Sequence, residues 1–169
     1  YTEKADEIAV GKAKGLLKKD LSPKRVSSDE LHHLVLSLRP EDFARLGNSE
    51  KQRRAALREI TRTAMSALEK ETGAEGLRWA AAIHRNTANP HVHIALQKEF
   101  FDKDLARRTL TKIPRELLPH YDIRDGEKLF VSGHLIDAAT EKLEQIAARV
   151  VTAEKSPEKS RTSPVREHT

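Results

Sequence analysis

Three short segments of the chain alternate apolar and polar residues in the way that is typical of β-strands. In the first, residues 31–39, one face holds Leu34, Leu36 and Leu38 and the other holds His33, Val35 and Ser37. Residues 77–84 and 91–97 are the second and third expected strands. The six residues between them, Arg85–Pro90, predict a tight hairpin loop. We therefore expect an antiparallel sheet with one face buried.

Two longer segments carry apolar residues at helical spacing. Ser49 and Gln52 have the form of a capping box that opens a helix, and Gly73 fits its C-terminal cap. The apolar stripe between them consists of Leu57, Ile60, Ala64, Ala67 and Leu68. Residues 135–151 form the second expected helix, by the same criterion. The pattern predicts an α+β fold, in which a central antiparallel sheet is flanked by helices.

The remaining segments set the expected domain boundaries. Residues 121–131 favour a short strand pair that turns at Asp125-Gly126. Residues 154–169 combine Ser, Thr, Pro and charge with little that could be buried, so we expect a disordered polar tail or linker there. The sequence thus predicts one domain over residues 1–153.

Composition narrows the classes of partner and chemistry. The chain has 169 residues and a net charge of +5, and such a basic excess favours an anionic partner, most commonly nucleic acid. The absence of cysteine excludes disulfides, thiolate metal sites and a cysteine nucleophile. No apolar run approaches the ~20 residues that cross a bilayer, and no signal peptide is visible. We therefore expect a cytoplasmic protein without membrane insertion.

The most informative chemistry lies in the second and third expected strands. His91 and His93 are two residues apart, so both rings point to one face of the third strand. The short hairpin brings His84 close to them, and the neighbouring Ala80, Ala82 and Ala95 leave space for a substrate. Three imidazoles that leave coordination positions open are typical of a catalytic metal centre. The sequence predicts a divalent metal bound by these three histidines.

The same residues resemble a known family. His91-Val92-His93 is a histidine-hydrophobic-histidine (HUH) motif, and with Asn89-Pro90 before it and Ile94 after it resembles the third motif of conjugative and mobilization relaxases. The branch that it resembles most is that of the plasmid P-type relaxases. The strand of residues 31–39 is similar to their second motif, in which a serine contacts DNA near the nick; that serine is Ser37 here. Many relatives have an aspartate that supports the metal ligands where this chain has Asn86, whose amide oxygen can still orient an imidazole.

The resemblance implies a mechanism, a cofactor and partners. In such relaxases a tyrosine hydroxyl attacks the scissile phosphate of one DNA strand beside the metal, which leaves a 5′-phosphotyrosyl link and a free 3′-hydroxyl. The implied cofactor is Mg²⁺ or Mn²⁺, with Zn²⁺ as an alternative. The implied partners are single-stranded DNA at an origin of transfer, relaxosome accessory proteins and a type IV secretion coupling protein. The implied location is the bacterial cytoplasm, from which the protein can be carried with the DNA into a recipient cell.

The chain contains two tyrosines that could supply the hydroxyl, Tyr1 and Tyr121. By similarity, relaxases place the nucleophile near the N-terminus, upstream of the serine strand, so Tyr1 is the expected catalytic residue. We expect it to reach the sheet face that carries Ala80, Ala82 and Ala95. Because the chain does not begin with Met, a tyrosine upstream of position 1 stays an alternative. Tyr121 lies after the HUH strand, as in replication initiators of this superfamily.

Basic residues complete the expected DNA site. Residues 12–25 form a basic arm that includes Lys18 and Lys19, and Arg78 and Arg85 are expected near the histidines. Three other functions stay open at this point. The chain could be an HUH replication initiator or transposase, a three-histidine metalloenzyme that acts on a small molecule, or a DNA-binding module that has lost its catalytic tyrosine.

Overall fold

The computed structural model describes residues 1–2, 30–85 and 89–156. Its elements in chain order are β1 (Leu31–Ser37), α2 (Pro40–Ala44), α3 (Glu50–Thr72), β2 (Trp79–His84), β3 (His91–Gln97), β4 (Glu99–Phe101), β5 (Arg107–Thr109), η2 (Arg115–Leu117), β6 (His120–Arg124), β7 (Glu127–Val131) and α4 (His134–Lys155). The first three strands form an antiparallel sheet in the order β1-β3-β2, and the others form two hairpins, β4-β5 and β6-β7. The predicted α+β fold is confirmed.

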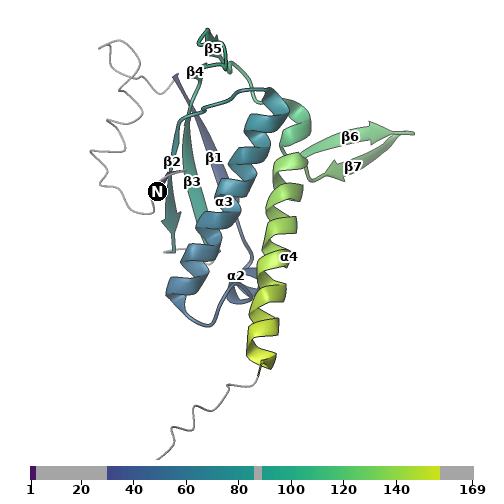
Figure 1. Cartoon of the computed structure of the whole chain (residues 1–169). Coiled ribbons are helices and arrows are strands. Elements are labelled where there is room, and N and C mark those ends of the chain that lie inside the picture. Colours follow the sequence, from purple (N-terminus) through teal and green to yellow (C-terminus); the bar gives the residue numbers. More distant parts are fainter. Residues whose placement is uncertain (3–29, 86–88, 157–169) are drawn as a thin grey trace, which may run out of the picture.

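The central sheet has one covered face and one open face. Val92, Ile94 and Leu96 of β3 are buried in the core that the sheet shares with α3. Figure 1 shows α3 lying across this face and α4 running beside α3. Since both long helices of the described ranges lie on this side, the alternate residues of the three strands, including the histidines, form the open face.

The long helix α3 begins and ends where the sequence predicts. The Ser49 side chain accepts a hydrogen bond from the backbone N–H of Gln52, and the Gln52 side chain accepts one from the N–H of Asn48. At the other end, Gly73 adopts the left-handed conformation with φ of 67°, which a residue without Cβ adopts at no steric cost. These caps fix the length of the helix that covers the sheet.

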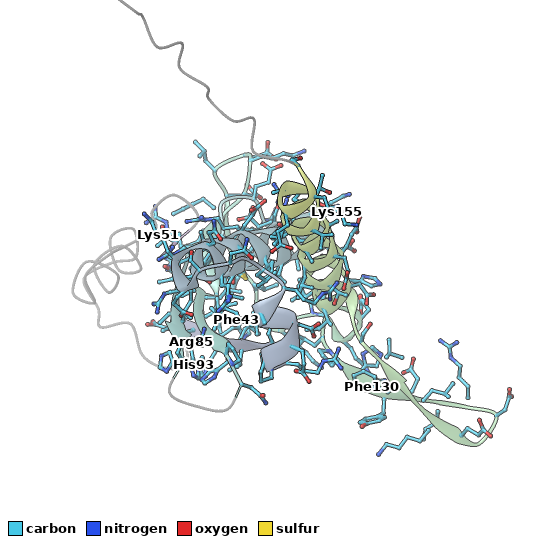
Figure 2. All side chains as sticks on the ribbon, turned by 90° about the horizontal axis from the view of Figure 1, so that it is seen from below. Phe43, Lys51, Arg85, His93, Phe130 and Lys155 are labelled. Carbon is cyan, nitrogen blue, oxygen red and sulfur yellow. The ribbon has the colours of Figure 1, made fainter. Side chains whose placement is uncertain are left out.

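The C-terminal elements extend beyond the central sheet. Strands β6 and β7 pair around Asp125-Gly126, as the sequence predicts, and form a ribbon that projects from the body (Figures 1 and 2). Helix α4 continues to Lys155, past the expected start of the tail at residue 154, and residues 157–169 lie outside the described part. None of the helices in the described ranges combines the length and hydrophobicity that crossing a bilayer requires.

Candidate metal centre

Sheet register brings the three predicted ligands together. His84 of β2 pairs with His91 of β3, and Ala82 pairs with His93, so all three histidines lie on the open face. The ring centroids are 5.4 Å apart for His84 and His91, 4.6 Å for His84 and His93, and 4.9 Å for His91 and His93. Each ring offers a nitrogen that lies within 4.8 Å of a nitrogen of the other two. Three imidazole nitrogens at this spacing can be drawn onto one divalent ion by small rotamer changes.

Hydrogen bonds orient two of these rings. The Nδ1 atom of His91 lies 3.0 Å from the carbonyl oxygen of Asn89, which can only accept a hydrogen bond. The Nδ1 atom of His91 therefore carries the proton, and its Nε2 atom carries the lone pair that can bind a metal. The Nδ1 atom of His93 lies 2.9 Å from Nε2 of His33 on β1. Either ring can donate in this contact; when the Nδ1–H of His93 is the donor, Nε2 of His93 is left for the metal.

His33 is a fourth histidine at this site, and sequence reasoning did not single it out. Its ring stacks on that of His93, with centroids 5.0 Å apart and an interplanar angle of 11°. The signal was present in the alternation of β1, which places His33 on the same face as Ser37. The sequence does not show which residue of β3 lies beside His33. The register of β1 against β3 places His33 diagonally beside His93.

The surroundings of His93 favour its neutral form. Burial lowers the pKa of His93, and the nearby rings of His84, His91 and His33 lower it further. A neutral ring keeps the lone pair that a metal requires, so this electrostatic environment suits ligation.

The side chains that surround the histidines on the open sheet face are small. Ser37 pairs with His91 and is exposed at the end of β1, which is where the sequence expects it to contact DNA. Ala80 and Ala82 of β2 and Ala95 of β3 continue the open face away from the metal centre. Side chains of this size leave room for an extended substrate against the sheet.

Comparison with known proteins decides the family. The model of the MobL relaxases matches residues 2–118, a range that contains β1, β2, β3 and all of the histidines just described. This chain belongs to the MobL relaxases. It is therefore a mobilization relaxase of the HUH type, an enzyme that nicks DNA and binds it at an origin of transfer. No curated protein and no solved structure gives a significant match.

One expected residue of this relaxase occupies a different place. The backbone of Tyr1 pairs with Ala81, and its nitrogen and its carbonyl oxygen each form a 2.8 Å hydrogen bond that extends the edge of β2. Its side chain is only 8% exposed, packs edge-on against Trp79, and donates a hydrogen bond to Oγ1 of Thr61 on α3 at 2.7 Å. Burial raises the pKa of Tyr1 to about 12. The expected position on the open face is therefore wrong, because the ring packs in the core between the sheet and α3, where its hydroxyl has a hydrogen-bond partner.

The second tyrosine of the relaxase is also remote from the histidines. Tyr121 lies on the β6-β7 ribbon, where its ring contacts Phe130 and the ammonium of Lys128. Figure 2 labels Phe130 at the far side of the molecule from His93. Neither tyrosine of the chain faces the metal centre in this structure.

The expected basic residues fall into three groups. The guanidinium of Arg85 forms an ion pair with Glu50 at 2.9 Å and stacks over the ring of Phe43, so it ties β2 to the helices. Arg78 directly precedes β2, whose other end is His84. Because the strand between them is extended, Arg78 lies far from the histidines, and its expected position near them is wrong. The predicted residues Lys18, Lys19 and Asn86 lie outside the described part of the chain.

Proposed function

We propose that this relaxase cuts one strand at an origin of transfer by metal-assisted transesterification on the open sheet face. The observation that carries the proposal is the trio His84, His91 and His93, whose ring nitrogens lie within 4.8 Å of one another. The composition of the site fits a divalent cation, because three neutral imidazoles leave coordination positions open for phosphate oxygens. Mg²⁺ or Mn²⁺ fits a phosphate substrate, and Zn²⁺ is the alternative that the imidazoles favour.

Each protein residue has a defined part in this proposal. His91 and His93 bind through Nε2, since their Nδ1 atoms face Asn89 and His33. His93 can bind in this way only if its Nδ1–H donates to Nε2 of His33, so His33 acts as the positioning residue. A bound cation supplies Lewis-acid polarisation of the scissile phosphate. The exposed hydroxyl of Ser37, beside His91, donates to a non-bridging phosphate oxygen or to the neighbouring backbone of the DNA.

The attacking group in the proposed reaction is a tyrosine hydroxyl. Its oxygen forms a bond to phosphorus while the bond to the leaving 3′-oxygen breaks, and the hydroxyl proton passes to that oxygen or to water. Tyr1 is held in the core by Thr61 and Tyr121 lies on the ribbon. We therefore propose that the hydroxyl comes from a segment outside these 169 residues. The proposed relaxosome and secretion partners rest on the family resemblance.

The test is a nicking assay on supercoiled plasmid that carries the origin of transfer of the protein's own mobile element, with a protein that also contains the segment proposed to supply the tyrosine. We expect nicking with Mg²⁺ or Mn²⁺, none with a chelator, and a loss of at least about a hundredfold in His91→Ala. His134→Ala is the matched control, because His134 lies at the start of α4 beside Glu71 and away from the metal centre. Nicking by His91→Ala at the rate of the control would overturn the assignment of the ligands.

A further inference from the structure

The open sheet face that carries the histidines has another feature at its opposite end. Between the end of the sheet and the β4-β5 hairpin is a cavity of about 190 Å³, in which aromatic and polar side chains meet. Its walls include Arg78, Gln97, Glu99, Phe100, Phe101 and Arg107. The metal centre does not use any of these residues.

Gln97 is the unusual member of this cavity. It follows His91, His93 and Ala95 at alternate positions of β3, so its side chain belongs to the histidine face. The hairpin covers it there, and it is only 2% exposed. Its Oε1 atom has no hydrogen-bond partner among the described residues. A buried acceptor without a donor is unfavourable, and such a group is expected to have a ligand or another specific role.

The other walls indicate which donor would satisfy Gln97. Phe100 and Phe101 supply aromatic surface, on which the flat face of a base can stack. Glu99 forms an ion pair with Arg107, so the cavity is not a purely cationic binding site for phosphate. Pockets for drug-sized ligands have about 300–1,000 Å³, so this smaller volume favours a single ring system. The oxygen of a carboxamide can accept a hydrogen bond from the exocyclic amino group of a base and so distinguish that base from others.

The position of the cavity relates it to the DNA strand. Gln97 lies six positions after His91 along β3, which corresponds to about 20 Å in an extended strand. The path between them runs over Ala80, Ala82 and Ala95, whose small side chains leave the face open. A strand whose scissile phosphate lies at the histidines can therefore extend to the cavity within a few nucleotides.

We propose that this cavity binds one unstacked base of the single-stranded DNA, and that Oε1 of Gln97 accepts a hydrogen bond from the exocyclic amino group of that base. Arg78, at the rim where its backbone carbonyl accepts from the N–H of Gln97, contacts the adjoining DNA backbone. The inference rests on the proposed function, because it takes the strand from the metal centre as its ligand. It adds a point at which the enzyme distinguishes bases.

The test compares three fluorescein-labelled strands of 12 nucleotides by fluorescence anisotropy, namely oligo-dC, oligo-dT and a strand of abasic residues with the same phosphates. Stacking in the cavity predicts that oligo-dC binds about tenfold more tightly than the abasic strand. The amino group of cytosine, which thymine lacks, predicts tighter binding of oligo-dC than of oligo-dT. Gln97→Met is expected to remove the preference for dC over dT and to leave the affinity for the abasic strand unchanged.

Two variants keep the outcome interpretable. Gln145→Leu on the exposed surface of α4 is the control for removal of a glutamine amide. If Gln97→Met does not fold, Phe101→Ala at the half-exposed wall tests the same cavity, and it should reduce the gain of oligo-dC over the abasic strand.

Unchanged base preference in the folded variant overturns the inference. The inference is also overturned if the protein shows no preference among the strands but free dCMP competes for binding in the wild type and not in Gln97→Met. That result would indicate a site for a free nucleotide. A wild-type chain that binds none of the strands contradicts the proposed function itself.

Discussion

The individual residues of the candidate site divide into those that sequence spacing defines and those that packing defines. His84, His91 and His93 could be predicted, since the period of a strand and a short hairpin fix which side chains share a face. His33 required the register between β1 and β3, which spacing along the chain does not contain. Tyr1 was misplaced because a family position says nothing about which face of the sheet an aromatic ring will choose.

Replacing Tyr1 by Phe tests its structural role. The variant should keep the nicking rate and lose about 0.5–1.5 kcal/mol of unfolding free energy, because the hydroxyl donates to buried Thr61. Nicking and urea denaturation measure the two effects, and Tyr121→Phe on the exposed ribbon is the matched control. Loss of the covalent protein-DNA adduct on a denaturing gel in Tyr1→Phe alone would show that Tyr1 leaves the core to act as the nucleophile.

The pKa of Tyr1 gives a second test at the same residue. It is raised from 10.0 to about 12 in the folded chain, so the native state resists ionisation that the unfolded state undergoes. The stabilisation is fully present below pH 10 and is lost as the pH rises through about 12. The stability of the wild type should therefore fall more steeply between pH 10 and 12 than that of Tyr1→Phe. Parallel stability curves would contradict the burial of this hydroxyl.

His33 is tested through metal affinity rather than activity. His33→Ala leaves the Nδ1–H of His93 without its acceptor and should weaken Mn²⁺ binding about 10–100-fold. His33→Gln, whose Oε1 can accept the same hydrogen bond, should recover most of the affinity, and His134→Ala should not change it. Equal affinity for wild type and His33→Ala in a calorimetric titration would remove His33 from the site.

At the scale of elements, local patterns were sufficient where the signal is local. The caps at Ser49 and Gly73 and the turn at Asp125-Gly126 appear where the sequence predicts them. The β4-β5 hairpin was not predicted, because each strand has only three residues, too few for an alternating pattern. Its placement over Gln97, which creates the cavity, depends on tertiary packing.

The entry into α4 offers a test of one such packed junction. Gly133 has φ of 82°, and a Cβ there would lie 2.5 Å from the backbone carbon of Leu118. Gly133→Ala combines left-handed strain with this overlap and should destabilise the fold by about 2–5 kcal/mol. Gly126→Ala, with φ of 81° but open space around its Cβ position, should lose only about 1–2 kcal/mol. Similar losses in chemical denaturation would mean that the junction is not as tight as described.

At the scale of the whole molecule, we expect positive charge to set how strongly the relaxase binds DNA. The net charge of +5 includes the basic arm of residues 12–25. Neutralising Lys18 and Lys19 to Gln should reduce the slope of log affinity for single-stranded DNA against log salt by up to ~1–2. Lys51 and Lys70 lie on α3, which packs on the sheet face opposite the histidines. The matched pair Lys51→Gln and Lys70→Gln should therefore leave the slope nearly unchanged. An effect of equal size in both pairs would mean that the arm acts only through net charge.

We propose that three histidines on the open sheet face, His84, His91 and His93, form the metal centre of this relaxase. Calorimetric titration of Mn²⁺ into the chain, with a single-stranded oligonucleotide present to supply phosphate oxygens, tests it most directly. One ion should bind per chain in the wild type and in His134→Ala, and this binding should be lost in His84→Ala, His91→Ala and His93→Ala. Binding that persists unchanged in these three variants would show that the three histidines do not hold the ion.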